Sequence, residues 1–297
     1  MAGGEPILRA MRPLALLLLA LAAPLAAQPG AGEPDGRRPP LYLVEHGGAK
    51  LYLLGSVHVL PVGALPLPDH VEAVLDAATT VVFEVTDGQS DRDVLDLLVA
   101  ATDEATIADL LDASQRAALH AAVRARGWPG RALDDVEPWY GALRFSGLGP
   151  TAEALGEGVD AYLHRRALQA GKAVEALETT ADQVAAFDDL PDAAQVAYLM
   201  GMVEADTAAS NAYDALVASW EAGDEEGLWD ALVADVGEGA LFEALLLRRN
   251  RAWMPGVRAL LDRPGDVTLV VVGAGHLIGP GSVVDLLRAD GLKVRKL

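Results

Sequence analysis

Two stretches near opposite ends of the chain share one pattern of apolar and polar residues. Each is a short run of Val and Leu that leads into a Gly-x-x-His motif, and the two stretches cover residues 51–58 and 268–276. Such runs are typical of strands buried on both faces of a parallel sheet, and the glycine lets the chain turn tightly where a strand ends. The sequence therefore predicts that His58 and His276 each follow the carboxyl end of a buried strand.

The rest of the pattern predicts further strands at both ends of the chain and helices between them. Gly47-Gly48 separates two alternating runs, as the turn of a β-hairpin does. Helical periodicity dominates residues 91–165 and 182–263, with breaks at Leu190-Pro191 and Gly223-Asp224. The predicted strands cover residues 41–46, 49–54, 80–85, 172–177, 268–273 and 291–297.

Strands at both ends and helices in the middle predict an α/β fold, with α+β character in places. We expect residues 41–85, 172–178 and 268–297 to form one central mixed sheet, and a large helical insertion, about residues 91–263, to form a cap. The chain has 297 residues and is 52% hydrophobic, which suffices for a large core. Residues 41–297 are therefore expected to form a single domain rather than two domains in tandem.

The amino terminus has the parts of a secretory signal peptide. Arg9 and Arg12 precede an apolar run over residues 14–27, and small residues end that run. The run is shorter than the roughly 20 residues that cross a membrane. We expect residues 1–27 to be a signal peptide and residues 28–40 a loose linker. The protein would then be exported across the inner membrane to the periplasm or beyond, and an uncleaved signal that tethers it to the membrane is the alternative.

Composition narrows the classes of function. The formal net charge is −20, so a nucleic-acid partner is not expected, because phosphates require a basic surface. The chain has no cysteine, which excludes disulfides, thiolate metal sites and a cysteine nucleophile. The serines lack the G-x-S-x-G context of many hydrolases, and Gly273-Ala-Gly275 lacks the third glycine of a dinucleotide fingerprint.

Four residues that bind metals or transfer protons stand at the carboxyl ends of predicted strands: His58, Glu84, Glu178 and His276. If those strands are parallel neighbours, the side chains converge on one edge of the sheet. Two imidazoles and two carboxylates suit Zn²⁺, Mn²⁺, Co²⁺ or Fe²⁺. A metal there would lower the pKa of bound water and polarise a carbonyl group.

Each candidate residue also has a purely structural interpretation. His58 could cap a helix, although the repetition of the motif favours a shared function with His276. A carboxylate such as Glu84 is costly at the end of an apolar strand unless it is paired, whereas Glu178 could simply favour the first turn of a helix. Arg249 could belong to a solvated basic face, or it could clamp a carboxylate or stabilise a developing oxyanion.

Taken together and in order, these motifs resemble the TraB/GumN family (TraB, PrgY, GumN), which includes the Tiki metalloproteases. The likeness also extends to a Glu-Pro-Trp motif, a Gly-Val-Asp-Ala-Tyr-Leu stretch and the closing helix and strand. It covers nearly the whole chain after the signal sequence. The matching pieces are residues 51–58, 81–84, 137–139, 158–179, 220–224, 249–253, 272–279 and 284–294.

This resemblance implies a secreted or membrane-associated protein with both Gly-x-x-His motifs and a glutamate in one site. Tiki proteins cleave peptides with Mn²⁺ or Co²⁺, and the chain is more distantly similar to erythromycin-esterase-like and ChaN-like haem-uptake proteins. The implied function is a metal-dependent, protease-like hydrolase of the cell envelope with a peptide or small-molecule substrate. The alternatives are a non-catalytic protein of the same fold that binds a peptide or haem-like ligand, and a structural partner of an envelope machine.

The resemblance also implies roles for the candidate residues. His58 and His276 would bind the metal, which would be Mn, Co or Zn. Glu84 and Glu178 would complete the metal site or act as general base. Arg249 would lie at the rim of the site and stabilise charge on the substrate.

Overall fold

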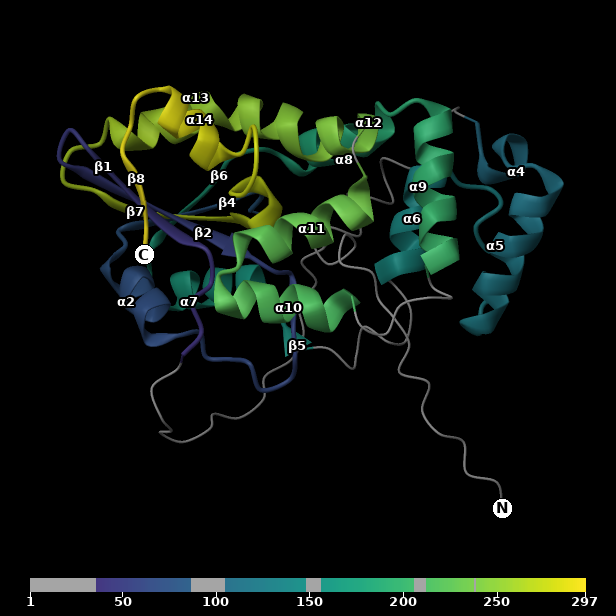
Figure 1. Ribbon diagram of the computed structural model, residues 1–297, viewed down its shortest axis with the longest axis horizontal. Coiled ribbons are helices and arrows are strands. Elements are labelled where there is room, and N and C mark those ends of the chain that lie inside the picture. The colour runs from purple at the N-terminus through teal and green to yellow at the C-terminus, as the bar shows by residue number, and fades with distance from the viewer. Residues whose placement is uncertain (1–35, 87–104, 148–155, 206–211, 238) are drawn as a thin grey trace, which may run out of the picture.

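A six-stranded sheet lies at the centre of the fold, in the strand order β6-β4-β7-β2-β1-β8 (Figure 1). The computed structural model describes residues 36–86, 105–147, 156–205, 212–237 and 239–297. The strands of the central sheet are β1 (Leu41–His46), β2 (Ala49–Ser56), β4 (Thr80–Phe83), β6 (Ala173–Ala176), β7 (Val267–Gly273) and β8 (Val294–Lys296).

The sheet is mixed, and it joins the two ends of the chain as predicted. Strands β6, β4, β7 and β2 are parallel, whereas β1 is antiparallel to both β2 and β8. The strands that carry the two Gly-x-x-His motifs are direct neighbours, with Ser56 paired to Gly273. The predicted hairpin turn is also present, at Gly47 and Gly48, whose φ angles are +58° and +90°. The topology therefore places both motifs at the same edge of one sheet.

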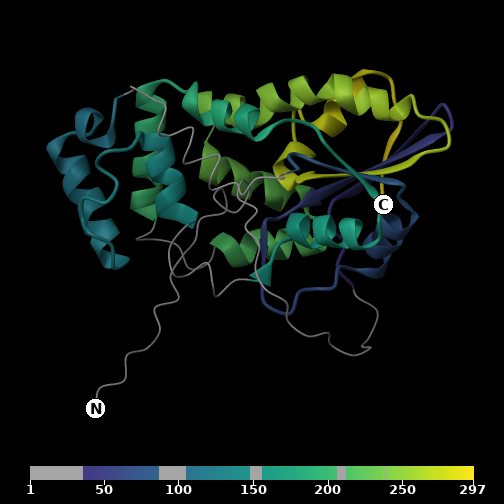
Figure 2. The ribbon, with the colours of Figure 1, turned by 180° about the vertical axis from the view of Figure 1, so that it is seen from behind.

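Helices cover both faces of this sheet. Alternate residues of β7 point to opposite sides: Leu269 and Val271 face one apolar core, and Val270 and Val272 face another. The first core is closed by α2 (Asp69–Ala77), α7 (Val159–Gln169), α10 (Ala212–Ala222) and α11 (Glu225–Val236), and the second by α13 (Arg249–Leu261) and α14 (Val283–Ala289). Figures 1 and 2 show the two layers on opposite sides of the strands.

The helical insertion also builds a third apolar core beside the sheet (Figure 1). This core buries Trp139, Phe187 and Leu199, among other residues. Its helices are α4 (Ile107–Leu110), α5 (Ala113–Ala125), α6 (Pro138–Gly147), α8 (Thr180–Asp188) and α9 (Asp192–Ala205). The predicted breaks are confirmed, because Leu190-Pro191 separates α8 from α9 and Gly223-Asp224 separates α10 from α11.

One continuous helical segment connects the third core to the sheet. It consists of α12 (Ala240–Phe242), the π-helix η2 (Glu243–Arg248) and α13. Leu245 and Leu246 of η2 pack in the third core, whereas Trp253 of α13 packs against the sheet. The remaining short elements are β3 (Val59–Leu60), which pairs with β5 (Gly156–Glu157), and the 3₁₀ turn η3 (Ala274–His276).

The predicted signal peptide, residues 1–27, lies outside the described residues. Of the predicted linker, only residues 36–40 are described, and this part is packed rather than loose. Pro39 and Pro40 are buried, and the Arg38 backbone N–H donates to the Glu221 carbonyl at 2.5 Å. Within the described ranges, no helix has the length and apolar character that crossing a membrane requires.

Candidate functional site

Arg249 occupies the centre of the candidate site, whereas we expected it at the rim. It is the first residue of α13, and only 4% of its surface is exposed. Each N–H of its guanidinium faces an acceptor, as the following distances show. Nη2 donates to Glu84 Oε2 at 2.6 Å and to Glu178 Oε1 at 2.5 Å. Nε donates to Glu178 Oε1 at 3.1 Å. Nη1 donates to the Leu245 carbonyl oxygen at 2.9 Å and lies 3.2 Å from His276 Nε2. Arg249 therefore pairs with two buried carboxylates at once, and its single positive charge offsets one of their two negative charges.

Glu84 follows β4 and uses its two carboxylate oxygens differently. Oε2 accepts from Arg249 and from Gln183 Nε2 (3.2 Å), whereas Oε1 accepts from the Gly273 backbone N–H (2.7 Å) and lies 3.7 Å from His276 Nε2. Burial raises the pKa of Glu84, but Arg249 and the histidines outweigh this effect and lower it to about 2. The carboxylate is therefore ionised at neutral pH, and Oε1 faces the second Gly-x-x-His motif.

His276 is buried where β7 runs into η3, with 2% of its surface exposed. Its Nδ1 atom lies 2.6 Å from Asn250 Oδ1, and its ring packs 4.4 Å from that of Trp253 between centroids. Burial and the neighbouring Arg249 outweigh the attraction of Glu84 and lower the pKa of His276 to about 3. The imidazole is therefore neutral at neutral pH.

His58 is held from the opposite side by the start of α7. Its Nδ1 atom lies 2.7 Å from Asp160 Oδ2, and Ser56 Oγ donates to Asp160 Oδ1 at 2.7 Å. Gly158 permits this approach, because a Cβ there would lie 1.9 Å from the His58 carbonyl oxygen. His58 Nε2 is buried and has no hydrogen-bond partner among the described residues. Burial lowers the pKa of His58, but the Asp160 carboxylate outweighs this effect and raises it.

Glu178 lies just before Thr179, the residue that caps α8, and so it stands ahead of the first helical turn. Both of its oxygens contact Arg249, and Oε2 also accepts from Trp253 Nε1 at 2.8 Å. Burial raises the pKa of Glu178 against the attraction of Arg249. In the described part of the chain, neither oxygen contacts a histidine, and the side chain holds Arg249 in place.

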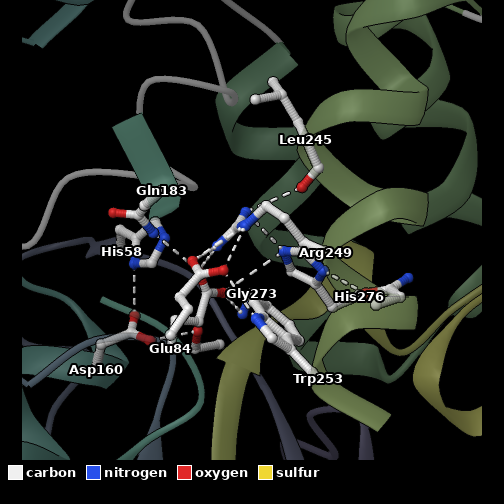
Figure 3. A network of polar contacts seen from close by, with 12 residues as sticks. His58, Glu84, Asp160, Gln183, Leu245, Arg249, Trp253, Gly273 and His276 are labelled. Carbon is white, nitrogen blue, oxygen red and sulfur yellow. Dashed lines mark hydrogen bonds and ion pairs between the residues drawn. The ribbon is translucent and has the colours of Figure 1, made fainter. Parts of the chain in front are cut away.

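The structure brings all five predicted residues to the carboxyl ends of β2, β4, β6 and β7. Figure 3 shows His58 and His276 on either side of Glu84 and Arg249. His58 is one of the groups that lower the pKa of His276. Both motifs therefore lie at one edge of the sheet, beside Glu84. That they share one metal or catalytic site stays a prediction, and so do the roles of these residues as ligands or catalytic groups.

Sequence reasoning missed the residues that hold the histidines. Asp160 stands two residues after a glycine at a helix start, and Asn250 interrupts a leucine-rich helix next to Arg249. Both positions were visible as polar residues within family-like motifs. The sequence did not show which way their side chains face.

The types of donor atom present are ones that divalent metals bind, but the described side chains are not assembled as a metal site. Among the described residues, no three His, Cys, Asp or Glu side chains are grouped closely enough to hold a metal ion. Yet His58 Nε2 is a buried nitrogen with no partner in this part of the chain, and His276 Nε2 lies 3.7 Å from Glu84 Oε1. Two imidazole nitrogens and one carboxylate oxygen are common ligands of Mn²⁺, Co²⁺ and Zn²⁺. His276 Nε2 also lies 3.2 Å from Arg249 Nη1, and this contact would have to open for a cation to bind there.

Comparison with known proteins gives a family match over nearly all of the described chain. The sequence model of the TraB/PrgY/gumN family matches residues 40–296. The chain is 26% identical over 243 residues to "Uncharacterized protein YbaP" of Escherichia coli (strain K12), a match that covers 82% of this chain and 89% of that protein. The protein of the same name from Shigella flexneri gives the same identity and coverage. No solved structure matches the chain significantly.

Proposed function

Because the chain belongs to the TraB/PrgY/gumN family, we propose that it is a metal-dependent hydrolase of the cell envelope that cleaves peptide bonds. The observation that supports this most is the arrangement of the two histidines. The Nδ1 atom of each ring contacts a side-chain oxygen, and both histidines lower the pKa of Glu84. His58, His276 and Glu84 would hold a divalent Mn, Co or Zn ion through the two Nε2 atoms and Oε1.

The chain's own residues prepare this site in distinct ways. When bound, a divalent ion supplies Lewis-acid polarisation of a carbonyl group and acidifies water. Glu84 provides a carboxylate that is ionised at neutral pH, as its pKa of about 2 indicates. Arg249 fixes the other oxygen of Glu84, and Glu178 and Trp253 keep Arg249 and the carboxylates in a fixed geometry. The side chains of the five predicted site residues are all largely buried, so charges in the site interact more strongly than they would in water.

Metal analysis of the purified protein tests this proposal directly. The wild type should retain or take up about one divalent ion, and it should cleave a library of unstructured peptides when Mn²⁺, Co²⁺ or Zn²⁺ is supplied. His58→Ala and His276→Ala should lose both properties. His120→Ala is a matched control, since His120 also contacts an aspartate, with Nε2 2.6 Å from Asp134 Oδ1, but lies in the helical part. If His120→Ala lost metal to the same extent, the proposed site would be wrong.

A non-catalytic binding protein is the second candidate, and one observation favours it. Arg249 already pairs with both Glu84 and Glu178, and its Nη1 atom lies 3.2 Å from His276 Nε2, the atom that a metal would need. The peptide library separates the two functions. Retention of a peptide without cleavage, in the presence of each metal, would favour the binding protein over the hydrolase.

We also propose that the protein is exported across the inner membrane to the periplasm or beyond. The support is the basic flank and apolar run of residues 1–27. A site for envelope peptides requires this location, because such substrates lie outside the cytoplasm.

A further inference from the structure

The two histidines of the site are held by matching arrangements from different elements. His58 Nδ1 contacts Asp160 in α7, and His276 Nδ1 contacts Asn250 in α13, at 2.7 Å and 2.6 Å. In both cases the contact is made to Nδ1, and in both cases the contacting atom is a side-chain oxygen. Each group that contacts a ring also has a second partner: Ser56 Oγ donates to Asp160, and Asn250 Nδ2 donates to the Gly281 carbonyl oxygen.

The contacts of Asn250 determine the tautomer of His276. Asn250 Nδ2 lies 3.0 Å from the Gly281 carbonyl oxygen, which can only accept a hydrogen bond. The amide nitrogen of Asn250 must therefore face Gly281, and its oxygen must face the ring. Because that oxygen also only accepts, the proton of neutral His276 lies on Nδ1. The lone pair on Nε2 then faces Arg249 and Glu84.

The contacts of Asp160 determine the tautomer of His58 in the same way. An ionised carboxylate accepts hydrogen bonds and donates none. Asp160 Oδ1 accepts from Ser56 Oγ, which leaves Oδ2 to accept from His58 Nδ1. A neutral His58 therefore carries its proton on Nδ1 and has a free lone pair on Nε2. This lone pair is buried and has no donor among the described residues.

A purely structural role for the His58–Asp160 pair does not account for the buried His58 Nε2 atom. Burying an acceptor without a partner is unfavourable, and a histidine that served only to fix α7 would gain nothing from it. Histidines that bind metals almost always donate their other ring N–H to a carboxylate or carbonyl oxygen, and these outer partners fix the tautomer and the ring orientation. Both histidines of this site meet that description.

We propose that Asp160 and Asn250 are positioning residues that hold His58 and His276 in the same tautomer, so that both Nε2 lone pairs are offered to one divalent cation. Ser56 orients Asp160, and the Gly281 carbonyl orients Asn250. This inference rests on the proposed metal site, but its structural part, the tautomer of each ring, is measurable without metal.

The test compares tautomers and metal affinity in the purified protein. Nitrogen-15 NMR of the imidazoles, recorded with EDTA at about pH 9, well above the ordinary pKa of histidine, reports which nitrogen carries the proton. The chain has six histidines, so the two signals are assigned by their absence in His58→Gln and His276→Gln. Wild-type His58 and His276 should both be protonated on Nδ1. Asp160→Ala should release only His58 from this form, and Asn250→Ala should release only His276.

The dissociation constant for Mn²⁺ is the second measurement. Asp160→Ala and Asn250→Ala should each weaken binding by about 10–100-fold, and Asp160→Asn should weaken it less, since the amide oxygen still accepts from Nδ1. The matched control is Asp134→Ala, which removes a contact of 2.6 Å to His120 away from the site and should leave the affinity unchanged. Circular dichroism and urea unfolding verify that each variant folds. If Asp160→Ala does not fold, Asp160→Asn supplies the comparison.

The outcomes separate this inference from the proposed function. Protonation on Nε2 of either histidine in the wild type overturns the inference, and so does a pair of variants that keep both the tautomers and the affinity. If the wild type binds neither Mn²⁺, Co²⁺ nor Zn²⁺, the proposed metal site fails. In that case the tautomers alone support or overturn the positioning roles.

Discussion

At the scale of single residues, Arg249 pairs with two buried carboxylates at once, and its removal would leave both without their cationic partner. Arg249→Met should lower the free energy of unfolding by about 3–5 kcal/mol, the usual cost of breaking a buried ion pair. Urea unfolding of both proteins measures this difference. Arg251→Met is the matched control, because Arg251 lies on the same helix and pairs with Glu243 at the exposed surface.

For the exposed pair the loss should be at most about 1 kcal/mol. Equal losses in the two variants would mean that the Arg249 cluster is not a buried ion-pair network. The contrast tests burial rather than charge, since both substitutions remove one guanidinium.

His276 predicts a specific loss of stability in acid. Its pKa is lowered from 6.5 to about 3 in the folded protein. Below pH 6.5 the unfolded chain binds a proton that folded His276 does not, so this stability is complete above that pH and is lost as the pH falls toward 3. Over this window the slope should approach about 1.4 kcal/mol per pH unit.

Urea unfolding between neutral pH and about pH 5, with EDTA, measures that slope in the wild type and in His276→Gln. The variant should lose most of the slope. Three neighbours also contribute, and they do so in both proteins. Glu84 loses its contribution between pH 4.5 and about 2, below the measured range. The raised pKa of Glu178 gives a contribution that is complete below pH 4.5 and is lost as the pH rises. The raised pKa of His58 gives a contribution that is complete below 6.5 and lost at higher pH. Parallel profiles for the two proteins would contradict a neutral, buried His276.

At the scale of elements, the strands were readable from the sequence because buried strands are short, apolar and ended by glycine. The run before Gly55 and the run before Gly273 became β2 and β7, side by side. The same reasoning placed Glu84 and Glu178 at the ends of their strands, since side chains at parallel carboxyl ends share one edge. The fold and four of the site residues therefore followed from local pattern and topology.

The helical contributions to the site were less predictable, because a single helical sequence does not reveal which polar residue faces inward. Asp160 lies among the exposed-looking polar residues of α7, and Arg249 was compatible with a solvated basic face. The direction of these side chains depends on how α7 and α13 pack on the sheet. That packing is set by apolar contacts of Leu163 and Trp253 with strand residues that are distant in the sequence. The π-helix before Arg249 was also not predicted, since its leucine-rich sequence suits an ordinary helix.

Gly158 is the point where α7 meets the first Gly-x-x-His motif, and it gives a prediction for the packing of this helix. In Gly158→Ala the new Cβ would lie 1.9 Å from the His58 carbonyl oxygen, so the backbone of α7 must move. The free energy of unfolding should fall by about 2 kcal/mol or more, and the His58–Asp160 contact should open.

Gly256→Ala is the control for this change. Gly256 lies inside α13, and a Cβ there would approach nothing nearer than Leu177 Cδ2 at 4.0 Å. Alanine should therefore stabilise the helix by about 0.5–1 kcal/mol. Thermal unfolding compares the two variants, and a Gly158→Ala protein as stable as wild type would contradict the close backbone approach.

At the scale of the whole molecule, the two motifs reach each other only when both ends of the chain enter one sheet. His58 and His276 are 218 residues apart (276 − 58), so the site cannot form in either half of the protein alone. This long-range closure was predictable because the strands lie at the chain ends. The third core beside the sheet was not, because helical periodicity alone does not say which helices pack together.

Export is the prediction that belongs to the complete chain. Mass spectrometry of protein recovered from an expressing bacterium should show a mature form that lacks the first ~27 residues, as signal peptides have about 15–30. The mature form should be in the periplasmic or extracellular fraction. An intact amino terminus on cytoplasmic protein would refute export, and an intact terminus in the membrane fraction would favour the anchor.

The π-helix η2 determines the angle around the helix axis between the leucines that enter the third core and the arginine that enters the site. One continuous helix carries Leu245 and Leu246 into the third core and Arg249 into the site. A π-helix amounts to one inserted residue in an α-helix, and one residue corresponds to a rotation of about 100°. Deleting a single residue from 243–248 would make the helix more regular, yet it would turn either the leucines or Arg249 away from their partners. Relatives that keep the buried arginine should therefore tolerate length changes in the neighbouring loops far better than at this position.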